Sequence, residues 1–188
     1  MNLNAAMESV IRYAIAESLP EAAVRKALAD LPREKGRLVV IAVGKAAWRM
    51  ANAAHEMLGA RADEGVVITK YDHALGKIDR LRIFEAGHPV PDERSFQATR
   101  AAMDAVRGLG ECDQVLFLLS GGGSALFESP LIEPDELAFI TRQLLARGAE
   151  ISEINSIRKR LSAVKGGRFA QLCAPARVFT IALSDVLG

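Results

Sequence analysis

The sequence has little cysteine and no long apolar run. Its 188 residues include two cysteines, Cys112 and Cys173, far apart in the chain. We expect reduced thiols rather than a disulfide, as in a cytosolic protein. No apolar run reaches the roughly 18 residues needed to cross a bilayer, and no basic segment followed by an apolar core stands at the N-terminus. The sequence therefore predicts a cytoplasmic protein without a signal peptide or a membrane span.

An excess of charge of either sign is also missing. Lysine and arginine total 24, aspartate and glutamate total 23, and the formal net charge is +1. This balance gives no indication of binding to nucleic acid or to an acidic membrane surface. Half of the residues are apolar, which is enough for a well-packed core, and we find no internal repeat or low-complexity tract. We expect one domain over residues 1–188, with partners recognised locally.

Apolar runs alternate with amphipathic segments along the chain. The runs that we expect as strands are residues 38–43, 65–69, 82–86, 115–119 and 177–183. The segments that we expect as helices are residues 4–18, 20–28, 45–58, 92–107, 134–148 and 152–173, the last with a break at its two glycines. This order predicts an α/β fold, a doubly wound, mostly parallel Rossmann-like sheet flanked by helices, with a helical N-terminal cap. Ligands of such sheets bind beyond the carboxyl ends of the strands.

The most informative segment is a buried strand that ends in a glycine-rich loop. Without Cβ atoms, Gly121, Gly122 and Gly123 let backbone N–H groups face a ligand, and the hydroxyls of Ser120 and Ser124 add donors. The loop is neither a P-loop nor a dinucleotide fingerprint nor a nucleophile elbow. It predicts a site for a phosphate or a carboxylate. The alternative is a tight turn without a ligand.

Three further residues follow strands and should reach the same edge of the sheet. Lys45 follows a glycine at the start of a helix, where a cation is unfavourable unless a ligand needs it; otherwise it is a solvated lysine. His88 stands between Gly87 and Pro89 and fits an acid, a hydrogen-bond donor or a structural loop residue. Asp185 follows the last strand, a position typical of a Mg²⁺ ligand or a catalytic base, but also of a cap or turn residue.

A basic helical segment gives the second strong signal. At about 100° per residue, Asn155, Arg158, Ser162 and Lys165 fall in one row beside an apolar stripe. A polar row that borders the core is suited to line a cleft and to bind anionic groups. The alternative is a solvated basic face.

Five motifs occur in a fixed order. They are Gly-Lys-Ala-Ala at 44–47, Gly-His-Pro-Val-Pro-Asp at 87–92, Ser-Gly-Gly-Gly-Ser-Ala at 120–125, Glu-Ile-Asn through Lys-Gly-Gly at 153–167, and Ser-Asp-Val at 184–186. Together they resemble the N-terminal domain of the type II glycerate 2-kinases, a family also labelled hydroxypyruvate reductase. The resemblance covers essentially the whole chain. It implies ATP-dependent phosphoryl transfer to D-glycerate, giving 2-phosphoglycerate, with Mg²⁺, in a cleft shared with a C-terminal domain.

The resemblance also implies roles for individual residues. Lys45 would meet the transferring phosphoryl group or the substrate carboxylate, and the loop 120–124 would meet phosphate oxygens. Asp185 would hold Mg²⁺ or meet the substrate hydroxyl. The residues implied for anionic groups are Asn155, Arg158 and Lys165.

Two departures from the family pattern concern Arg160 and the last residues. Arg160 stands where the family often has histidine, and the motif at 184–186 continues in the family into a C-terminal domain that is absent here. We therefore expect an N-terminal fragment that binds ligands without turnover when isolated, and whose exposed apolar surface leads to self-association or poor solubility. The alternatives are an NAD(P)H-dependent hydroxypyruvate reductase and a non-catalytic phosphosugar-binding module.

Overall fold

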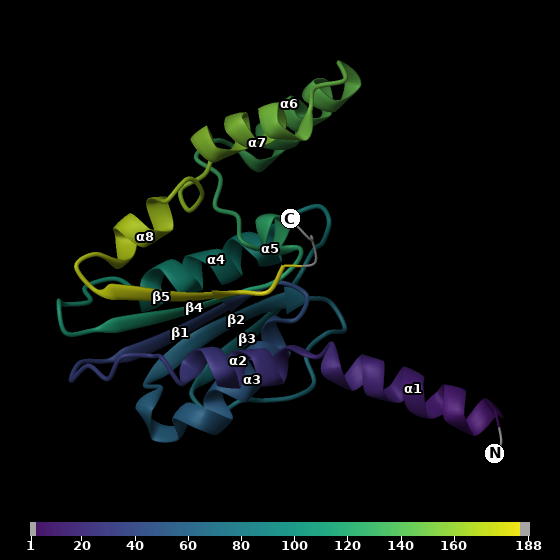
Figure 1. Cartoon of the computed structure of the whole chain (residues 1–188). Helices are drawn as coiled ribbons and strands as arrows, with labels where there is room; N and C mark the ends of the chain where they lie inside the picture. The colour runs from purple at the N-terminus through teal and green to yellow at the C-terminus, as the bar shows by residue number, and fades with distance from the viewer. Residues whose placement is uncertain (1–2, 185–188) are drawn as a thin grey trace.

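The five apolar runs form the five strands of one parallel sheet. The computed structural model describes residues 3–184 (Figure 1). The strand order is β3-β2-β1-β4-β5, with every neighbouring pair parallel. The strands are β1 (Leu38–Val43), β2 (Glu64–Lys70), β3 (Leu81–Ala86), β4 (Gln114–Leu119) and β5 (Arg177–Ala182). The predicted α/β sheet is confirmed.

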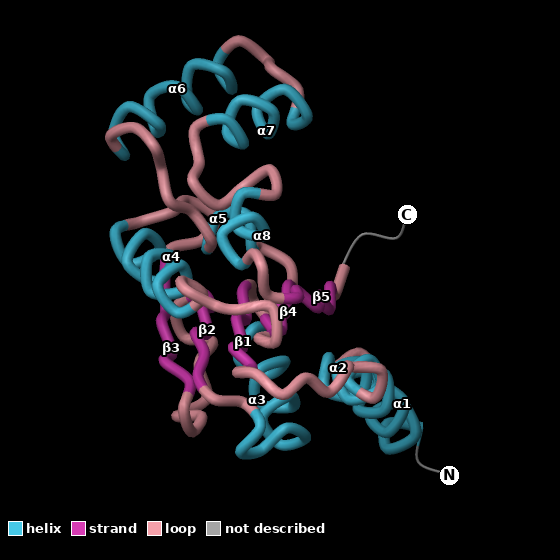
Figure 2. Tube along the Cα trace, turned by 90° about the vertical axis from the view of Figure 1, so that its left-hand side faces the viewer, coloured by secondary structure: helices cyan, strands magenta, loops and turns pink. Residues whose placement is uncertain are grey.

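Helices cover both faces of this sheet. The described helices are α1 (Leu3–Glu17), α2 (Pro20–Leu28), α3 (Ala47–Leu58), α4 (Glu93–Ala105), α5 (Gly123–Leu126), α6 (Pro134–Ala146), α7 (Ile151–Arg160) and α8 (Arg168–Cys173), with a 3₁₀ turn at Gly59–Arg61. In Figures 1 and 2, α2 and α3 lie on one face, and α4, α5 and α8 lie on the other. Among the described helices, none has the length and apolar character of a membrane span.

The core lies on both sides of the central strand β1, all six residues of which are buried. Ile41 packs with the cluster beneath α4 and α8, whereas Val40 packs with the cluster beneath α2 and α3. Alternate residues of a strand face opposite sides, so a strand buried on both faces must be apolar throughout. Both cysteines are free, and burial raises the pKa of the Cys173 thiol to about 11.

The predicted N-terminal cap is formed by α2 and not by α1. Val24 and Leu28 of α2 are buried against α3. Helix α1 extends away from the sheet (Figure 1). Its apolar side chains are more than half exposed, namely those of Met7, Val10, Ile11, Tyr13 and Ile15.

The chain between Arg160 and Arg168 is not helical, so the expectation of one helix with a break only at its glycines is wrong there. Ala163 N–H donates to the carbonyl of Ser129 at 2.8 Å, and a β-bridge joins Pro130 to Ser162. These pairings replace the helical hydrogen bonds. Asn155 and Arg158 are therefore on α7, whereas Ser162 and Lys165 lie beyond its end.

Candidate anion-binding site

The loops that follow β1 and β4 interlock at the carboxyl edge of the sheet. Ser120 N–H donates to the carbonyl of Val43 at 2.9 Å, and Lys45 N–H donates to the carbonyl of Gly121 at 2.8 Å. The hydroxyl oxygen of Ser120 accepts from Ala46 N–H at 3.1 Å. Lys45 thus lies just before α3 rather than in its first turn, and its backbone is fixed to the glycine-rich loop.

Gly44 makes this close approach of the two loops feasible. Its φ is +123°, and a Cβ at this position would overlap the hydroxyl oxygen of Ser120. Only glycine combines this backbone conformation with so near a neighbour. The glycine of the first loop is therefore matched to the serine of the second.

A third loop brings His88 to the same place. Gly122 has φ +84°, and a Cβ there would lie 2.8 Å from Nε2 of His88 and 3.4 Å from Cγ of Lys45. The loop of His88 is fixed by Asp92, whose carboxylate accepts from Ser95 N–H at 2.9 Å and caps α4. Lys45, His88 and Gly122 come from three loops that are far apart in the sequence, and the fold brings them together as predicted for this edge.

The electrostatics of this group favour an anion. Burial, and then the positive charges of Lys45, Lys70 and His73, lower the pKa of His88 below its usual value. The imidazole is therefore neutral near pH 7. Within residues 3–184 the ammonium group of Lys45 makes no hydrogen bond or ion pair. An exposed cation with no counter-charge among the described residues, beside a neutral imidazole, suits a negatively charged ligand.

Several N–H groups of the glycine-rich loop also have no protein acceptor. In the part of the chain that the structure describes, the N–H groups of Gly121, Gly122 and Ser124 donate to no other residue. Successive backbone donors of this kind form a concave site for anions. The predicted anion-binding loop is consistent with this geometry. Helix α5, which begins at Gly123, was not expected from the sequence.

Two residues that were not expected from the sequence, Thr69 and Glu85, help to hold the backbone at Gly44 and Lys45, together with His73 of the loop 71–76, which was expected at this edge. Thr69 is buried and its hydroxyl donates to the carbonyl of Gly44 at 3.1 Å, and Nδ1 of His73 lies 3.1 Å from the carbonyl oxygen of Lys45. The carboxylate of Glu85 accepts from His73 N–H at 3.0 Å and so holds this loop. In the sequence, only their positions indicate this role: Thr69 and Glu85 lie near the ends of β2 and β3, and His73 follows β2.

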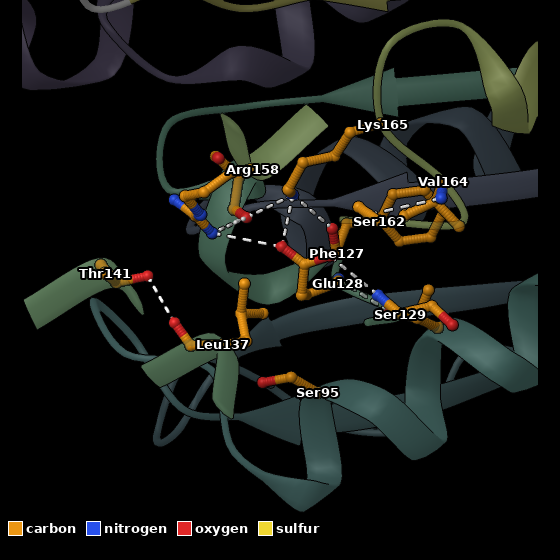
Figure 3. Close-up of polar contacts among 12 residues, drawn as sticks. Ser95, Phe127, Glu128, Ser129, Leu137, Thr141, Arg158, Ser162, Val164 and Lys165 are labelled. Carbon is orange, nitrogen blue, oxygen red and sulfur yellow. Dashed lines mark hydrogen bonds and ion pairs between the residues drawn. The ribbon is translucent and has the colours of Figure 1, made fainter. Parts of the chain in front are cut away.

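Arg158 and Lys165 meet at the buried carboxylate of Glu128, a residue that was not expected in the site from the sequence (Figure 3). Glu128 is fully buried, and its Oε2 lies 3.2 Å from Nη2 of Arg158 and 3.2 Å from Nζ of Lys165. Both cations also donate to the carbonyl of Ser124, at 3.3 Å and 2.7 Å. Burial lowers the pKa of Lys165, against the opposing effect of Glu128. The two cations therefore hold the backbone at the end of the glycine-rich loop.

The remaining predicted residues are Asn155 and Asp185. Asn155 lines a cavity beyond the loop, together with Gly123 and Ser124. Asp185 lies outside the described residues. Across residues 3–184, no three His, Cys, Asp or Glu side chains are grouped so that they could hold a metal ion.

The strand order and the flanking helices define an α/β domain with a parallel sheet. The chain belongs to the family described as "Domain of unknown function (DUF4147)", which it matches over residues 6–188. It is 51% identical over 181 residues to a protein of Thermotoga maritima named "D-glycerate 2-kinase", and 43% identical over 156 residues to a "Glycerate 2-kinase" of Pyrococcus horikoshii. A protein of Agrobacterium vitis named "Putative hydroxypyruvate reductase" is 49% identical over 156 residues.

Solved structures agree with these matches. A crystal structure of the Thermotoga maritima glycerate kinase matches 96% of this chain with a TM-score of 0.87 and 51% identity. A Pyrococcus horikoshii protein matches 95% of it with a TM-score of 0.78 and 35% identity. The resemblance to the glycerate kinases is confirmed. The chain spans less than half the length of these relatives, 43% of the Thermotoga protein and 40% of the first Agrobacterium protein.

Proposed function

We propose that this domain supplies one half of a site for ATP-dependent phosphoryl transfer to D-glycerate, which gives 2-phosphoglycerate. One observation carries the proposal: Lys45, whose ammonium has no partner within residues 3–184, and the neutral imidazole of His88 both lie beside Gly122, whose N–H has no acceptor in the same range. The chain is also 51% identical, over 95% of its length, to a protein named D-glycerate 2-kinase. The other half of the site belongs to the part of that protein which this chain does not cover.

Phosphoryl transfer depends mainly on positioning and on stabilising negative charge. The N–H groups of Gly121, Gly122 and Ser124 donate to phosphate oxygens of ATP. Lys45 attracts the transferring phosphoryl group or the carboxylate of glycerate. His88 is neutral near pH 7, because burial and nearby cations lower its pKa, so its imidazole can accept a hydrogen bond from the substrate hydroxyl.

The proposal includes Mg²⁺, for which Asp185 would be a ligand; this residue follows β5 in the sequence. The ion, when bound, would neutralise charge on the phosphates, and it commonly takes one or two carboxylates and substrate oxygens as ligands. Arg158 and Lys165 add positive potential at Ser124, the residue that they both contact. A cytoplasmic location and a homo-oligomer stay predictions from the sequence.

Two relatives are named as putative hydroxypyruvate reductases, so reduction of hydroxypyruvate is the second candidate activity. A nicotinamide dinucleotide usually binds at a first strand-helix turn with the pattern Gly-x-Gly-x-x-Gly. The corresponding turn after β1 reads Gly-Lys-Ala-Ala-Trp-Arg at 44–49 and has a single glycine. The sequence of this turn therefore favours the kinase.

The test uses a chimera in which this chain replaces the matching part of the Thermotoga protein. ATP consumption is measured with D-glycerate and Mg²⁺, and the product is identified by its phosphorylated hydroxyl. We expect turnover in the chimera, and a loss of at least about 100-fold in kcat/KM with Lys45→Ala, comparable to removal of one charge-stabilising donor. Lys26→Ala, an exposed lysine of α2, should have no effect.

Other outcomes would overturn the proposal. Oxidation of NADPH with hydroxypyruvate, without ATP consumption, would assign the reductase activity. Tight binding of sugar phosphates to a folded chimera that turns over neither substrate would instead assign the phosphosugar-binding module.

A further inference from the structure

A cavity of about 430 Å³ lies next to the glycine-rich loop, and of its lining residues only Ser124 and Lys165 have a role in the proposal above. Gly122 faces Lys45 and His88, whereas the next two residues, Gly123 and Ser124, line the cavity. The loop therefore borders two compartments, one with the free cation and one with the cavity. A volume of this size is within the usual range for small-molecule sites.

The cavity is lined largely by aromatic and aliphatic groups. Three phenylalanine rings line it, with centroids 5.0 to 5.8 Å apart: Phe117 of β4, Phe127 just after α5, and Phe169 of α8. The cavity reaches the surface beside β5, where Val178 and Thr180 are exposed. It is thus an open, largely apolar slot lined by three aromatic rings, which suits a flat, unsaturated ring.

Polar side chains also line the cavity. Asn155 and Lys159 of α7 line it, and neither side chain makes a hydrogen bond or an ion pair within residues 3–184. The amide of Asn155 offers both donors and an acceptor, which is the pattern that the edge of a nucleobase requires. The ammonium of Lys159 offers a charge for a phosphate, and Ser124, with its free N–H, also lines the cavity.

We infer that this cavity binds the base of a purine nucleotide whose phosphates extend along the glycine-rich loop toward Lys45. The inference rests on the proposed function, which requires ATP, and it adds the place and the residues that hold the base. An apolar slot with aromatic rings takes the flat base, Asn155 contacts its edge, and Lys159 meets a phosphate. A competing occupant is an apolar segment of polypeptide that covers β5 in a longer protein, and the experiment separates the two.

The experiment compares two ligands that share phosphates but differ in the base. Calorimetry on the 188-residue chain measures the affinity for ATP and for inorganic tripolyphosphate. Ala170 of α8 lines the cavity and is exposed, whereas its exposed neighbour Gln171 does not line it. Ala170→Trp fills the slot from its rim without changing the core, and Gln171→Trp is the matched control.

We expect ATP to bind at least tenfold more tightly than tripolyphosphate. Ala170→Trp should reduce the affinity for ATP to that for tripolyphosphate and leave tripolyphosphate binding unchanged, while Gln171→Trp should bind both as the unsubstituted chain does. Asn155→Ala, the second variant, should reduce the ratio of ATP to GTP affinity without changing tripolyphosphate binding. Equal affinity for ATP and tripolyphosphate in the unsubstituted chain would overturn the inference.

The same variants in the chimera separate this inference from the proposed function. If Ala170→Trp leaves the KM for ATP and kcat unchanged, the kinase proposal stands and the base lies elsewhere. If ATP binds through the cavity but D-glycerate is never phosphorylated, the base site stands and the kinase proposal fails. If Ala170→Trp changes only the thermal stability of the chimera, polypeptide fills the slot and the inference is wrong.

Discussion

Gly122 faces His88 so closely that a Cβ on this glycine would lie 2.8 Å from the imidazole Nε2. The backbone of Gly122 also has φ +84°, a conformation that residues other than glycine adopt at a cost of about 1 kcal/mol. One residue thus meets two requirements, the conformation of the loop and room for the ring. The first prediction separates these requirements.

Gly122→Ala should weaken binding of tripolyphosphate by about tenfold, the effect of 1.4 kcal/mol, because the ring or the loop must shift. Gly148→Ala is the matched control, since Gly148 has φ +71° and its Cβ would meet no atom within 4 Å. Both variants should lose about 1 kcal/mol in the free energy of unfolding in urea. Only Gly122→Ala should lose affinity. Equal anion affinity in the two variants would show that the contact with His88 has no role in binding.

The second prediction concerns the titration of His88. Burial lowers its pKa first, and Lys45 adds to this effect. Lys45→Ala should therefore raise the pKa of His88 part of the way toward its usual value, measured by NMR titration of the imidazole. Lys26→Ala should leave it unchanged, because Lys26 is not among the charges that act on this ring. No change with Lys45→Ala would mean that the ammonium points away from the ring.

The sign of the pH dependence follows from the same shift. Because the folded chain holds His88 with a lowered pKa, the unfolded chain binds more protons between the two pKa values. Stability therefore falls as the pH drops below the usual histidine value of about 6.5. His88→Gln should lose less stability than the unsubstituted chain when the pH is lowered from 7 to 5.

The sequence predicted those features that follow from local pattern. The apolar runs gave the strands, and the strand-loop junctions at Lys45, His88 and Ser120 gave one edge of a parallel sheet, because the carboxyl ends of parallel strands lie together. Non-local partners could not be predicted. Nothing in the sequence around Glu128 indicates that its carboxylate is buried between two cations from residues 158 and 165.

The end of α7 shows the same limit. Helical spacing continues through Ser162 and Lys165, and the periodicity of side chains therefore favours a longer helix. The segment instead pairs with Ser129 and Pro130, residues about 30 positions earlier. A competing tertiary pairing decides the structure there, and a single sequence carries no signal for it.

The third prediction concerns Asp113, which joins the start of β1 to the turn before β4. Its carboxylate accepts from Arg37 N–H at 2.7 Å and from Gly110 N–H at 2.8 Å. These bonds, with that from Gly110 the largest contribution, lower the pKa of Asp113. The stabilisation is present above the usual carboxylate pKa and is lost as the pH falls through the lowered value.

Asp113→Asn should therefore reduce the free energy of unfolding by about 1 kcal/mol at pH 7. Urea unfolding at pH 7, 5 and 3 should show that the two curves approach each other as the pH falls. Asp104→Asn, at an exposed position of α4, should change little at any of these pH values. A constant difference between Asp113→Asn and the unsubstituted chain at all three pH values would contradict the pKa assignment.

The last prediction tests the buried group of Glu128, Lys165 and Arg158. Removing one partner of a buried ion pair leaves an uncompensated charge and typically costs about 3 kcal/mol or more, whereas removing both charges costs far less than the sum. Glu128→Gln should be strongly destabilising in urea, because Lys165 and Arg158 then lie close together without the carboxylate between them. Lys165→Met should cost less, because Glu128 keeps Arg158 at 3.2 Å. The double variant should be much less destabilised than the two single effects added together.

The exposed pair of Arg100 and Glu93 is the control for this cycle. Its atoms lie only 2.9 Å apart, but both side chains are more than half exposed. Such surface pairs contribute about 1 kcal/mol or less, so the coupling energy of this control should be small. If the coupling between Glu128 and Lys165 is equally small, water reaches the carboxylate, and the two cations are then free to contact a ligand at Ser124.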